Sequence, residues 1–123
     1  MITHASVYDR PSADGGGFRV LVMRYWPRGV KRSAVDLWLK DAAPTQELVH
    51  AYTHDGLPWD EFARRYRAEM LEQRPMVLQQ LRALEREHGR LMLLCHERIP
   101  PRDHCHREVL AELLAGSSEL QPT

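Results

Sequence analysis

Two cysteines and three histidines stand close together in one short segment, residues 93–110, which reads LLCHERIPPRDHCHREVL. Thiols and imidazoles attack electrophiles and bind metal ions, and neighbouring arginines hold anions. The segment also contains Glu97 and Arg107, so acid, base, nucleophile and cation all occur within it. The residue types therefore predict a functional site here, and three kinds of chemistry compete for it.

Nucleophilic catalysis is the first of these chemistries. Asp103 is predicted to cap a helix over residues 104–114, which places Cys105 in the first helical turn. The positive end of the helix dipole, together with Arg107 and a protonated His106, favours the thiolate form of Cys105. Free backbone N–H groups at the same helix start also suit an anion. The predicted catalytic residues are Cys105, His106 and Glu97.

A metal site is the competing hypothesis for the same residues, because thiolate, imidazole and carboxylate are zinc ligands. The spacing argues against it, since this cluster lacks a Cys-x-x-Cys or His-x-x-x-His pair. Cys95 and His96 are adjacent on a predicted strand and point to opposite faces, and Cys95 alone is typical of a small core residue. We therefore predict no metal. If one is bound, its ligands are expected to be Cys95, Glu97, Cys105 and His106.

Anion binding is the third chemistry, and the stretch RYWPRG at 24–29 carries it. Arginines form bidentate hydrogen bonds with phosphate or carboxylate, and tryptophan offers a stacking surface. The structural alternative is that one arginine pairs with an acid such as Asp36 while the tryptophan fills the core. His54 beside Asp55 has a base and an orienting carboxylate, although such a pair more commonly ties a loop. The predicted ligand-binding residues are Arg24, Trp26, Arg28, His54 and Arg107.

Three apolar runs, over residues 2–8, 18–26 and 90–96, are typical of strands. Helices are predicted from the cap at Thr45 to Tyr52, from Pro58 through Met70, and from Pro75 to the C-cap at Gly89, the last two as an antiparallel pair. Strands separated by helices predict an α/β fold with a small, mainly parallel sheet and helices packed around it. The carboxyl ends of parallel strands share one edge, so residues 24–29 and 95–107 should converge there.

The bulk composition narrows the function classes. At 123 residues the chain predicts one compact domain, over residues 1–116, followed by a tail over 117–123. Seventeen basic and seventeen acidic residues give zero formal charge, which argues against a dedicated nucleic-acid binder. The sequence shows no membrane span and no signal peptide, so we expect a cytoplasmic protein whose cysteines are free thiols or metal ligands.

The chain resembles the YeaO-like family, domain of unknown function 488, over nearly its full length. The resemblance rests on VYDRP (7–11), DGGGFRVLVMRYWPRGVKR (14–32), VDLWLKDAAPTQEL (35–48), HDGLPWDEFARRY (54–66), and LLCHE with CHREVL near the end. It implies a compact α/β fold and a shared pocket, without a known reaction. Members generally carry an acid where this chain has Met23, and serine where it has Thr45.

The function predicted from these observations is an anion-accepting small-molecule pocket, with thiol- or histidine-dependent catalysis as its candidate chemistry. A metal-binding protein that uses the cluster near residues 95–107 is the first alternative. A nucleic-acid interaction module that uses the arginines is the second. The substrate, any cofactor and the oligomeric state are not specified by the sequence.

Overall fold

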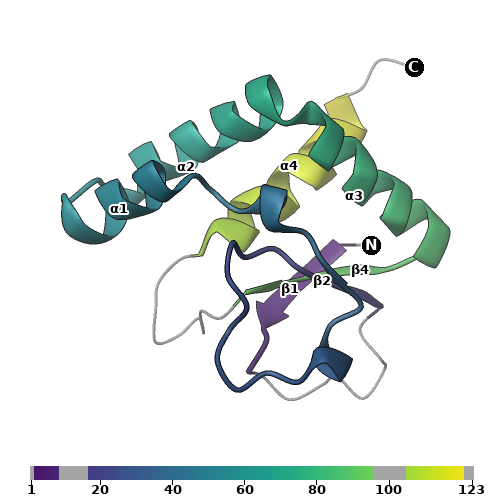
Figure 1. The fold of residues 1–123 in the computed structure, drawn as a ribbon. Coiled ribbons are helices and arrows are strands. Elements are labelled where there is room, and N and C mark those ends of the chain that lie inside the picture. The colour runs from purple at the N-terminus through teal and green to yellow at the C-terminus, as the bar shows by residue number, and fades with distance from the viewer. Residues whose placement is uncertain (1, 9–16, 96–104, 121–123) are drawn as a thin grey trace.

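A computed structural model describes residues 2–8, 17–95 and 105–120. Its four strands form one parallel sheet in the order β1-β4-β2-β3. The strands are β1 (Ile2–Ser6), β2 (Phe18–Leu21), β3 (Leu37–Trp38) and β4 (Leu91–Cys95). The predicted α/β fold with a parallel sheet is confirmed (Figure 1).

The two central strands carry apolar side chains that are buried in the core. Val20 and Leu93 are neighbours in the register of β2 and β4, and both are fully buried. β2 is shorter than predicted: Val22 still donates to the carbonyl of Leu94 at 2.9 Å, but after that residue the chain leaves the sheet. The carbonyl of Met23 then accepts a hydrogen bond from the Trp38 indole at 2.7 Å, which ties the departing segment to β3.

β3 was not predicted, because two residues are too few to show a strand pattern. Backbone hydrogen bonds from Asp36 to Arg19 and from Leu39 to Leu21 hold it against β2. The Arg19 side chain also binds the Asp36 carboxylate, with Nη2 and Oδ1 3.0 Å apart. Short 3-10 helices at Arg32–Ala34 and Lys40–Ala42 flank β3.

Four α-helices account for most of the remaining described residues: α1 (Gln46–His54), α2 (Trp59–Ala68), α3 (Pro75–His88) and α4 (His106–Leu120). The predicted N-cap at Thr45, the opening Pro75 and the C-cap at Gly89 are all confirmed. α4 runs to Leu120 instead of ending at Leu114. Asp103, its predicted cap, lies outside the described residues.

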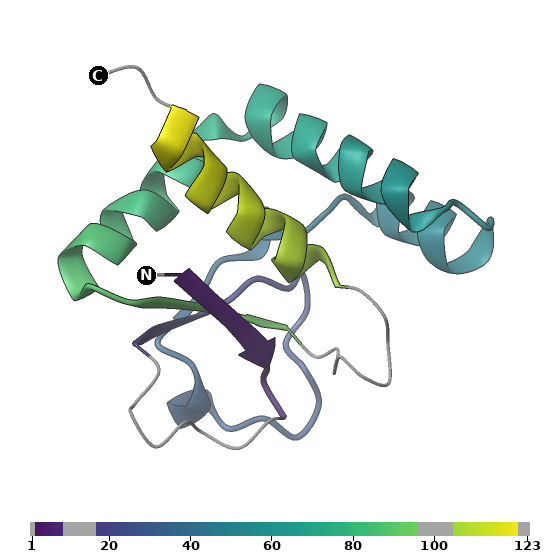
Figure 2. The same cartoon turned by 180° about the vertical axis from the view of Figure 1, so that it is seen from behind.

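The predicted antiparallel pairing of α2 with α3 is wrong. A π-helical segment, Glu69–Gln73, continues α2, and α3 begins immediately afterwards at Pro75. Figures 1 and 2 show α3 leading away from the end of α2 across this bend. The physical reason is that the two helices are joined by helical residues and a proline that can start a helix, which leaves no loop for a reversal.

Figures 1 and 2 show the helices gathered on one side of the sheet. The core lies between the helices and the sheet. It contains Val20, Leu91 and Leu93 from the strands, together with Tyr66 and Leu110 from the helices. No helix in the described ranges is long and apolar enough to cross a membrane. β2 and β4 thus end at the same edge of the sheet, under the start of α4.

Candidate functional site at the carboxyl edge of the sheet

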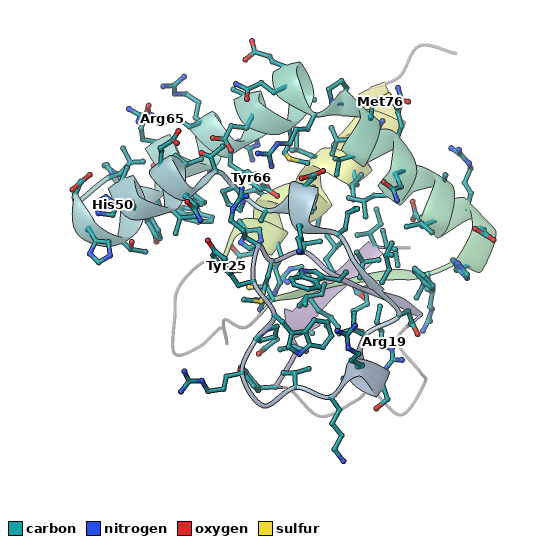
Figure 3. All side chains as sticks on the ribbon, viewed as in Figure 1. Arg19, Tyr25, His50, Arg65, Tyr66 and Met76 are labelled. Atoms are coloured by element: carbon teal, nitrogen blue, oxygen red, sulfur yellow. The ribbon has the colours of Figure 1, made fainter. Side chains whose placement is uncertain are left out.

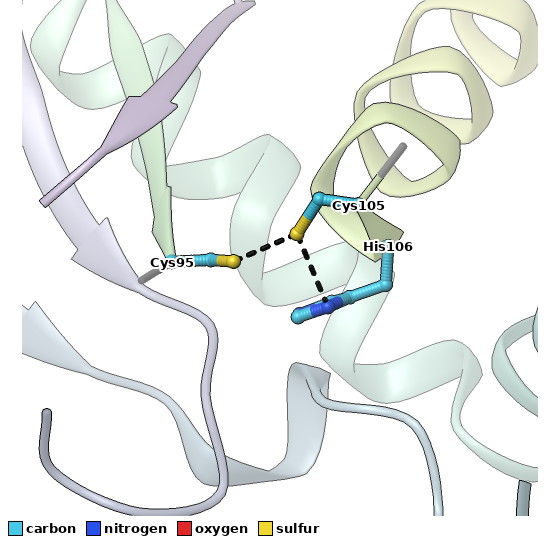
Figure 4. Close-up of side chains that lie close together, drawn as sticks. All are labelled: Cys95, Cys105 and His106. Atoms are coloured by element: carbon cyan, nitrogen blue, oxygen red, sulfur yellow. Dashed lines mark hydrogen bonds between the residues drawn. The ribbon is translucent and has the colours of Figure 1, made fainter. Parts of the chain in front are cut away.

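Two thiols and an imidazole meet where β4 ends and α4 begins (Figure 4). The Sγ atoms of Cys95 and Cys105 are 2.7 Å apart, and Cys105 Sγ lies 3.6 Å from His106 Nδ1. Both cysteines are buried thiols, with 1% and 4% of their surface exposed. The predicted convergence of Cys105 and His106 with the end of the last strand is therefore present in the structure.

The ring of His106 is fixed by the backbone that follows β2. Its Nε2 lies 2.7 Å from the carbonyl oxygen of Val22. A carbonyl oxygen only accepts hydrogen bonds, so Nε2 carries a proton, and in the neutral ring Nδ1 is an unprotonated acceptor. Nδ1 faces Cys105, and the ring of Tyr66 packs at right angles to the imidazole, with centroids 5.7 Å apart.

The other thiol, Cys95, has a cation beside it. Arg107 is 2% exposed and donates from Nη1 to Cys95 Sγ at 3.4 Å. Its Nε donates to His4 Nδ1 on β1 at 3.1 Å. Burial, followed by the charge of Arg107, lowers the pKa of His4, which keeps that imidazole a neutral acceptor. A guanidinium at this distance favours a thiolate at Cys95, so the cation predicted to assist Cys105 instead contacts the other sulfur.

A pocket of about 360 Å³ opens onto this cluster. Its apolar wall comes from the segment after β2 and from helices α1 and α2, and its polar groups include Arg24, three histidines and the two thiols. The lining residues are Met23, Arg24, Tyr25, Ala43, Pro44, Gln46, Val49, His50, Tyr52, Thr53, His54, Trp59, Phe62, Cys95, Cys105 and His106. None of these described lining residues is an aspartate or glutamate, so the charged side chain among them is a cation.

Besides Arg107, which contacts Cys95 and His4, the predicted ligand-binding residues divide into two groups. Arg24 and His54 line the pocket together with Cys105 and His106. Trp26 does not line it: its indole donates to the carbonyl of Val30 at 2.9 Å and its ring packs edge-on against Trp38. Arg28 is exposed, and its carbonyl accepts a hydrogen bond from the Tyr8 hydroxyl. Glu97 lies outside the described residues.

The acid considered as a partner for an arginine of residues 24–29 binds elsewhere, because Asp36 pairs with Arg19. Arg24 instead donates from Nη2 to the carbonyl of Pro44 at 3.2 Å. Its Nε is buried and has no hydrogen-bond partner among the described residues. The guanidinium at the pocket wall is therefore held by a neutral carbonyl and has no carboxylate partner in the described part of the chain.

The arginines of α2 support the prediction of a solvated helix face. Arg64 and Arg65 both bind the Glu61 carboxylate, the second of them at 2.9 Å. Arg67 binds Glu112 of α4 at 2.6 Å. These positive charges are paired with carboxylates on the surface.

Sequence reasoning missed His50 as a pocket residue. His50 and His54 form a His-x-x-x-His pair on α1, with ring centroids 4.6 Å apart, and both line the pocket. The spacing itself was a visible signal, since residues four apart share one face of a helix. Tyr25 was also missed; Figure 3 labels it together with His50. Its neighbours Arg24 and Trp26 were chosen instead because the sequence does not show which side chain turns toward α1.

A parallel α/β domain with a thiol–imidazole cluster at the carboxyl edge of its sheet is the class that this geometry defines. The chain belongs to the DUF488 family: the sequence model described as the active DUF488-N3 subclade matches residues 2–118. It is 38% identical over 114 residues to the uncharacterised protein Rv3073c of Mycobacterium tuberculosis, an alignment that covers 91% of this chain and 92% of the relative.

A second relative extends the similarity to the protein after which the YeaO-like resemblance is named. The uncharacterised protein YeaO of Escherichia coli is 38% identical over 68 residues, which is 54% of this chain and 58% of YeaO. No solved structure matches the chain significantly. The family assignment made from the sequence motifs is confirmed. Met23 lines the pocket of this chain.

Proposed function

We propose that the protein is a thiol-dependent enzyme that acts on a small anionic molecule bound in the pocket between α1 and the carboxyl edge of the sheet. The observation that carries the proposal is the orientation of His106, whose unprotonated Nδ1 faces Cys105 Sγ while Nε2 is held by the Val22 carbonyl. Cys105 is the nucleophile and His106 is the base. Glu97, predicted as a third catalytic residue, remains a sequence prediction.

The contacts support activation of Cys105 in two ways. Transfer of its proton to His106 Nδ1 produces an imidazolium, and the Val22 carbonyl stabilises that cation by accepting from Nε2–H. The thiolate that remains lies at the N-terminus of the 15-residue helix α4, where the helix dipole favours negative charge. Cys105 is therefore prepared to attack an electrophilic atom presented from the pocket.

The charge of the pocket supports an anionic substrate. Arg24 and three histidines line it, and no carboxylate from the described residues does so. Apolar and aromatic side chains, among them Tyr52, Trp59 and Phe62, form the remainder of the wall. Such a surface suits a molecule with a flat apolar body and an acidic substituent.

Two alkylating reagents that differ only in charge test this proposal. The test uses Cys95→Ser, in which Cys105 is the sole thiol, and measures the ratio of the alkylation rate with iodoacetate to the rate with iodoacetamide. We expect this ratio to be higher for Cys105 than for the thiol of glutathione, because the pocket attracts the anion. Met23→Glu places a carboxylate in the pocket wall and should abolish that difference. Met23→Gln has the same shape without the charge and should retain it. An iodoacetate preference equal to that of glutathione would contradict the anionic substrate class.

A metal site is the second candidate, because one specific observation favours it. Potential ligand atoms of Cys95, Cys105 and His106 lie within 4.8 Å of one another. Two thiolates and a histidine are the protein ligands of some catalytic zinc sites, and a backbone carbonyl on the second ring nitrogen is the usual support for such a histidine. The thiol separation of 2.7 Å is nevertheless shorter than the roughly 3.7 Å expected for two sulfurs on tetrahedral zinc.

Elemental analysis after dialysis separates the two candidates. The thiol enzyme proposal predicts well below about one zinc per chain, since this cluster has three ligands and two of them are closer than zinc requires. Stoichiometric zinc that disappears with Cys105→Ser would favour the metal site instead.

A further inference from the structure

We infer that Cys95 and Cys105 act as a two-thiol redox pair, and that the pocket takes a small anionic organic disulfide as its oxidising substrate. The first step rests on the proposed function, because Cys105 is again the attacking thiol. The role of Cys95 as the resolving thiol does not follow from that proposal. It is carried by the position of Cys95 and by the contact of this residue with Arg107.

The separation of the two sulfurs is the primary observation. They lie 2.7 Å apart, whereas a disulfide bond measures about 2.05 Å. A movement of less than about 1 Å therefore joins them. Cys95 is the last residue of β4 and Cys105 immediately precedes α4, so the ends of two regular elements present the sulfurs to each other (Figure 4).

The two thiols have different neighbours, which gives them different roles. Cys105 faces the proton acceptor His106 Nδ1 at 3.6 Å and is suited to begin the reaction. Cys95 accepts a hydrogen bond from the buried guanidinium of Arg107 at 3.4 Å. This cation stabilises the Cys95 thiolate, which is then available to attack a disulfide that forms at Cys105. Both sulfurs line the same pocket, so a substrate that reaches Cys105 lies within reach of Cys95 as well.

The reaction consists of two exchanges. The Cys105 thiolate attacks one sulfur of the substrate disulfide, which breaks the S–S bond, releases one substrate thiolate and forms a mixed disulfide. The Cys95 thiolate then attacks Cys105 Sγ, forms the internal disulfide and releases the second substrate thiolate. In total, the protein dithiol is oxidised by two electrons and the substrate disulfide is reduced to two thiols. A small dithiol reductant reverses the oxidation of the protein.

The aromatic carboxylate disulfide dithiobis(nitrobenzoate) is a suitable probe, because it combines a flat ring, an anionic group and an S–S bond. With the probe limiting, each molecule consumed by the reduced parent protein should release two coloured thiolates and leave no adduct. Intact mass should show the loss of two hydrogen atoms, and dithiothreitol should restore the original mass. Independent reaction of the cysteines would instead give one thiolate per probe and a retained adduct, which would overturn the inference.

Two variants separate this inference from the proposed function. Cys95→Ser should release one thiolate per probe and retain a stable adduct on Cys105, since nothing resolves the mixed disulfide. Cys105→Ser should react much more slowly, because the proton acceptor His106 Nδ1 faces the sulfur that this variant removes, whereas the remaining Cys95 accepts from Arg107. If Cys95→Ser reacts rapidly but the parent protein also retains the adduct, the redox pair is wrong and the thiol enzyme proposal stands. If Cys105 in Cys95→Ser reacts no faster than Cys95 in Cys105→Ser, the proposed function fails.

The measurement on the parent protein needs no substitution, so the inference remains testable if a variant does not fold. Circular dichroism before labelling identifies such a variant. Cys95→Ala then replaces Cys95→Ser, because an apolar side chain of smaller size is better tolerated at a buried position than an unpaired hydroxyl. A parent protein that retains the probe under every condition overturns the inference whatever the variants show.

Discussion

Single side chains at the site also hold the fold together, and Tyr66 illustrates this most directly. It lies completely buried on α2 and is labelled in Figure 3. Its hydroxyl donates to the carbonyl of Ala42, and its ring packs against His106. The hydroxyl thus ties α2 to the 3-10 helix before α1, while the ring supports the base of the proposed reaction. One residue therefore links the packing of the core to the position of the imidazole.

Tyr66→Phe should lower the free energy of unfolding by about 1–3 kcal/mol, because the buried carbonyl of Ala42 loses its donor while the packing of the ring is retained. Urea denaturation measures the change. Tyr52→Phe is the matched control, since Tyr52 is half-buried at the pocket wall, and it should change stability by less than about 0.5 kcal/mol. Equal losses in both variants would contradict a structural role for the Tyr66 hydrogen bond.

The same residue predicts a loss of stability at alkaline pH. Burial, followed by the negative potential of Cys105, raises the pKa of Tyr66 well above its ordinary value. The contribution of this group is fully present below the unfolded pKa of about 10 and is lost as pH rises above it, because only the unfolded chain releases the proton. The urea midpoint of the parent protein should therefore fall more steeply above pH 10 than that of Tyr66→Phe. Parallel curves would show that Tyr66 does not contribute.

At the scale of elements, the start of α1 is fixed by the end of α2. Thr45 Oγ1 accepts from the Leu48 amide at 3.3 Å and so caps α1. The Glu69 carboxylate accepts from the Thr45 amide at 3.1 Å and from its hydroxyl at 2.6 Å. The hydroxyl therefore serves two elements at once, which explains how α1 is positioned as a wall of the pocket.

Thr45→Ala removes both the cap and the hydroxyl bond to Glu69, and we expect it to lower the free energy of unfolding by about 1–2 kcal/mol. Thr45→Ser keeps the hydroxyl and should change stability by only a few tenths of a kcal/mol. Thermal unfolding of the two variants beside the parent protein gives the comparison. A loss with serine as large as the loss with alanine would show that the methyl group, and not the hydroxyl, is important.

The junction between β2 and β4 depends on the absence of a side chain at Gly17. This residue has a φ of +90°, and a Cβ added there would lie 2.4 Å from the Cβ of Arg90. Gly56 has a φ of +76° but nothing within 4 Å of such a Cβ. Both glycines have a positive φ, which strains any residue that carries a side chain, and only Gly17 also has a close neighbour.

Gly17→Ala should therefore cost more than about 2 kcal/mol of stability, from backbone strain and the clash together, whereas Gly56→Ala should cost about 1 kcal/mol from strain alone. Denaturant unfolding of both variants measures the difference. Equal effects would mean that the strand junction adjusts to the additional atom without cost.

At the scale of the whole molecule, the sequence predicted the parallel sheet and the edge at which Cys105 and His106 meet. Both follow from local rules: apolar runs form buried strands, and a long helical crossover makes β2 and β4 parallel. Other features depend on tertiary contacts that no local pattern encodes. The bend between α2 and α3, the neighbour of Arg107, and the direction in which Tyr25 turns are three such features.

The assignment of roles to the two cysteines shows the same limit. Position in sequence placed Arg107 near Cys105, since the two lie on one predicted helix. In the structure the Arg107 side chain instead donates to Cys95 at the end of β4 and to His4 on β1. The prediction that Cys95 is a small core residue agrees with its burial. This thiol also lines the pocket and lies against Cys105.

The central claim is that His106 activates Cys105, and the labelling rate of Cys105 at neutral pH tests it most directly. In Cys95→Ser, iodoacetamide should label Cys105 faster than it labels the thiol of glutathione, although Cys105 is buried. Adding His106→Gln should lower the labelling rate of Cys105 by about ten-fold or more. His50→Gln removes another imidazole from the same pocket and should leave the rate within about two-fold. Equal rates in the His106 and His50 variants, both folded by circular dichroism, would contradict the account.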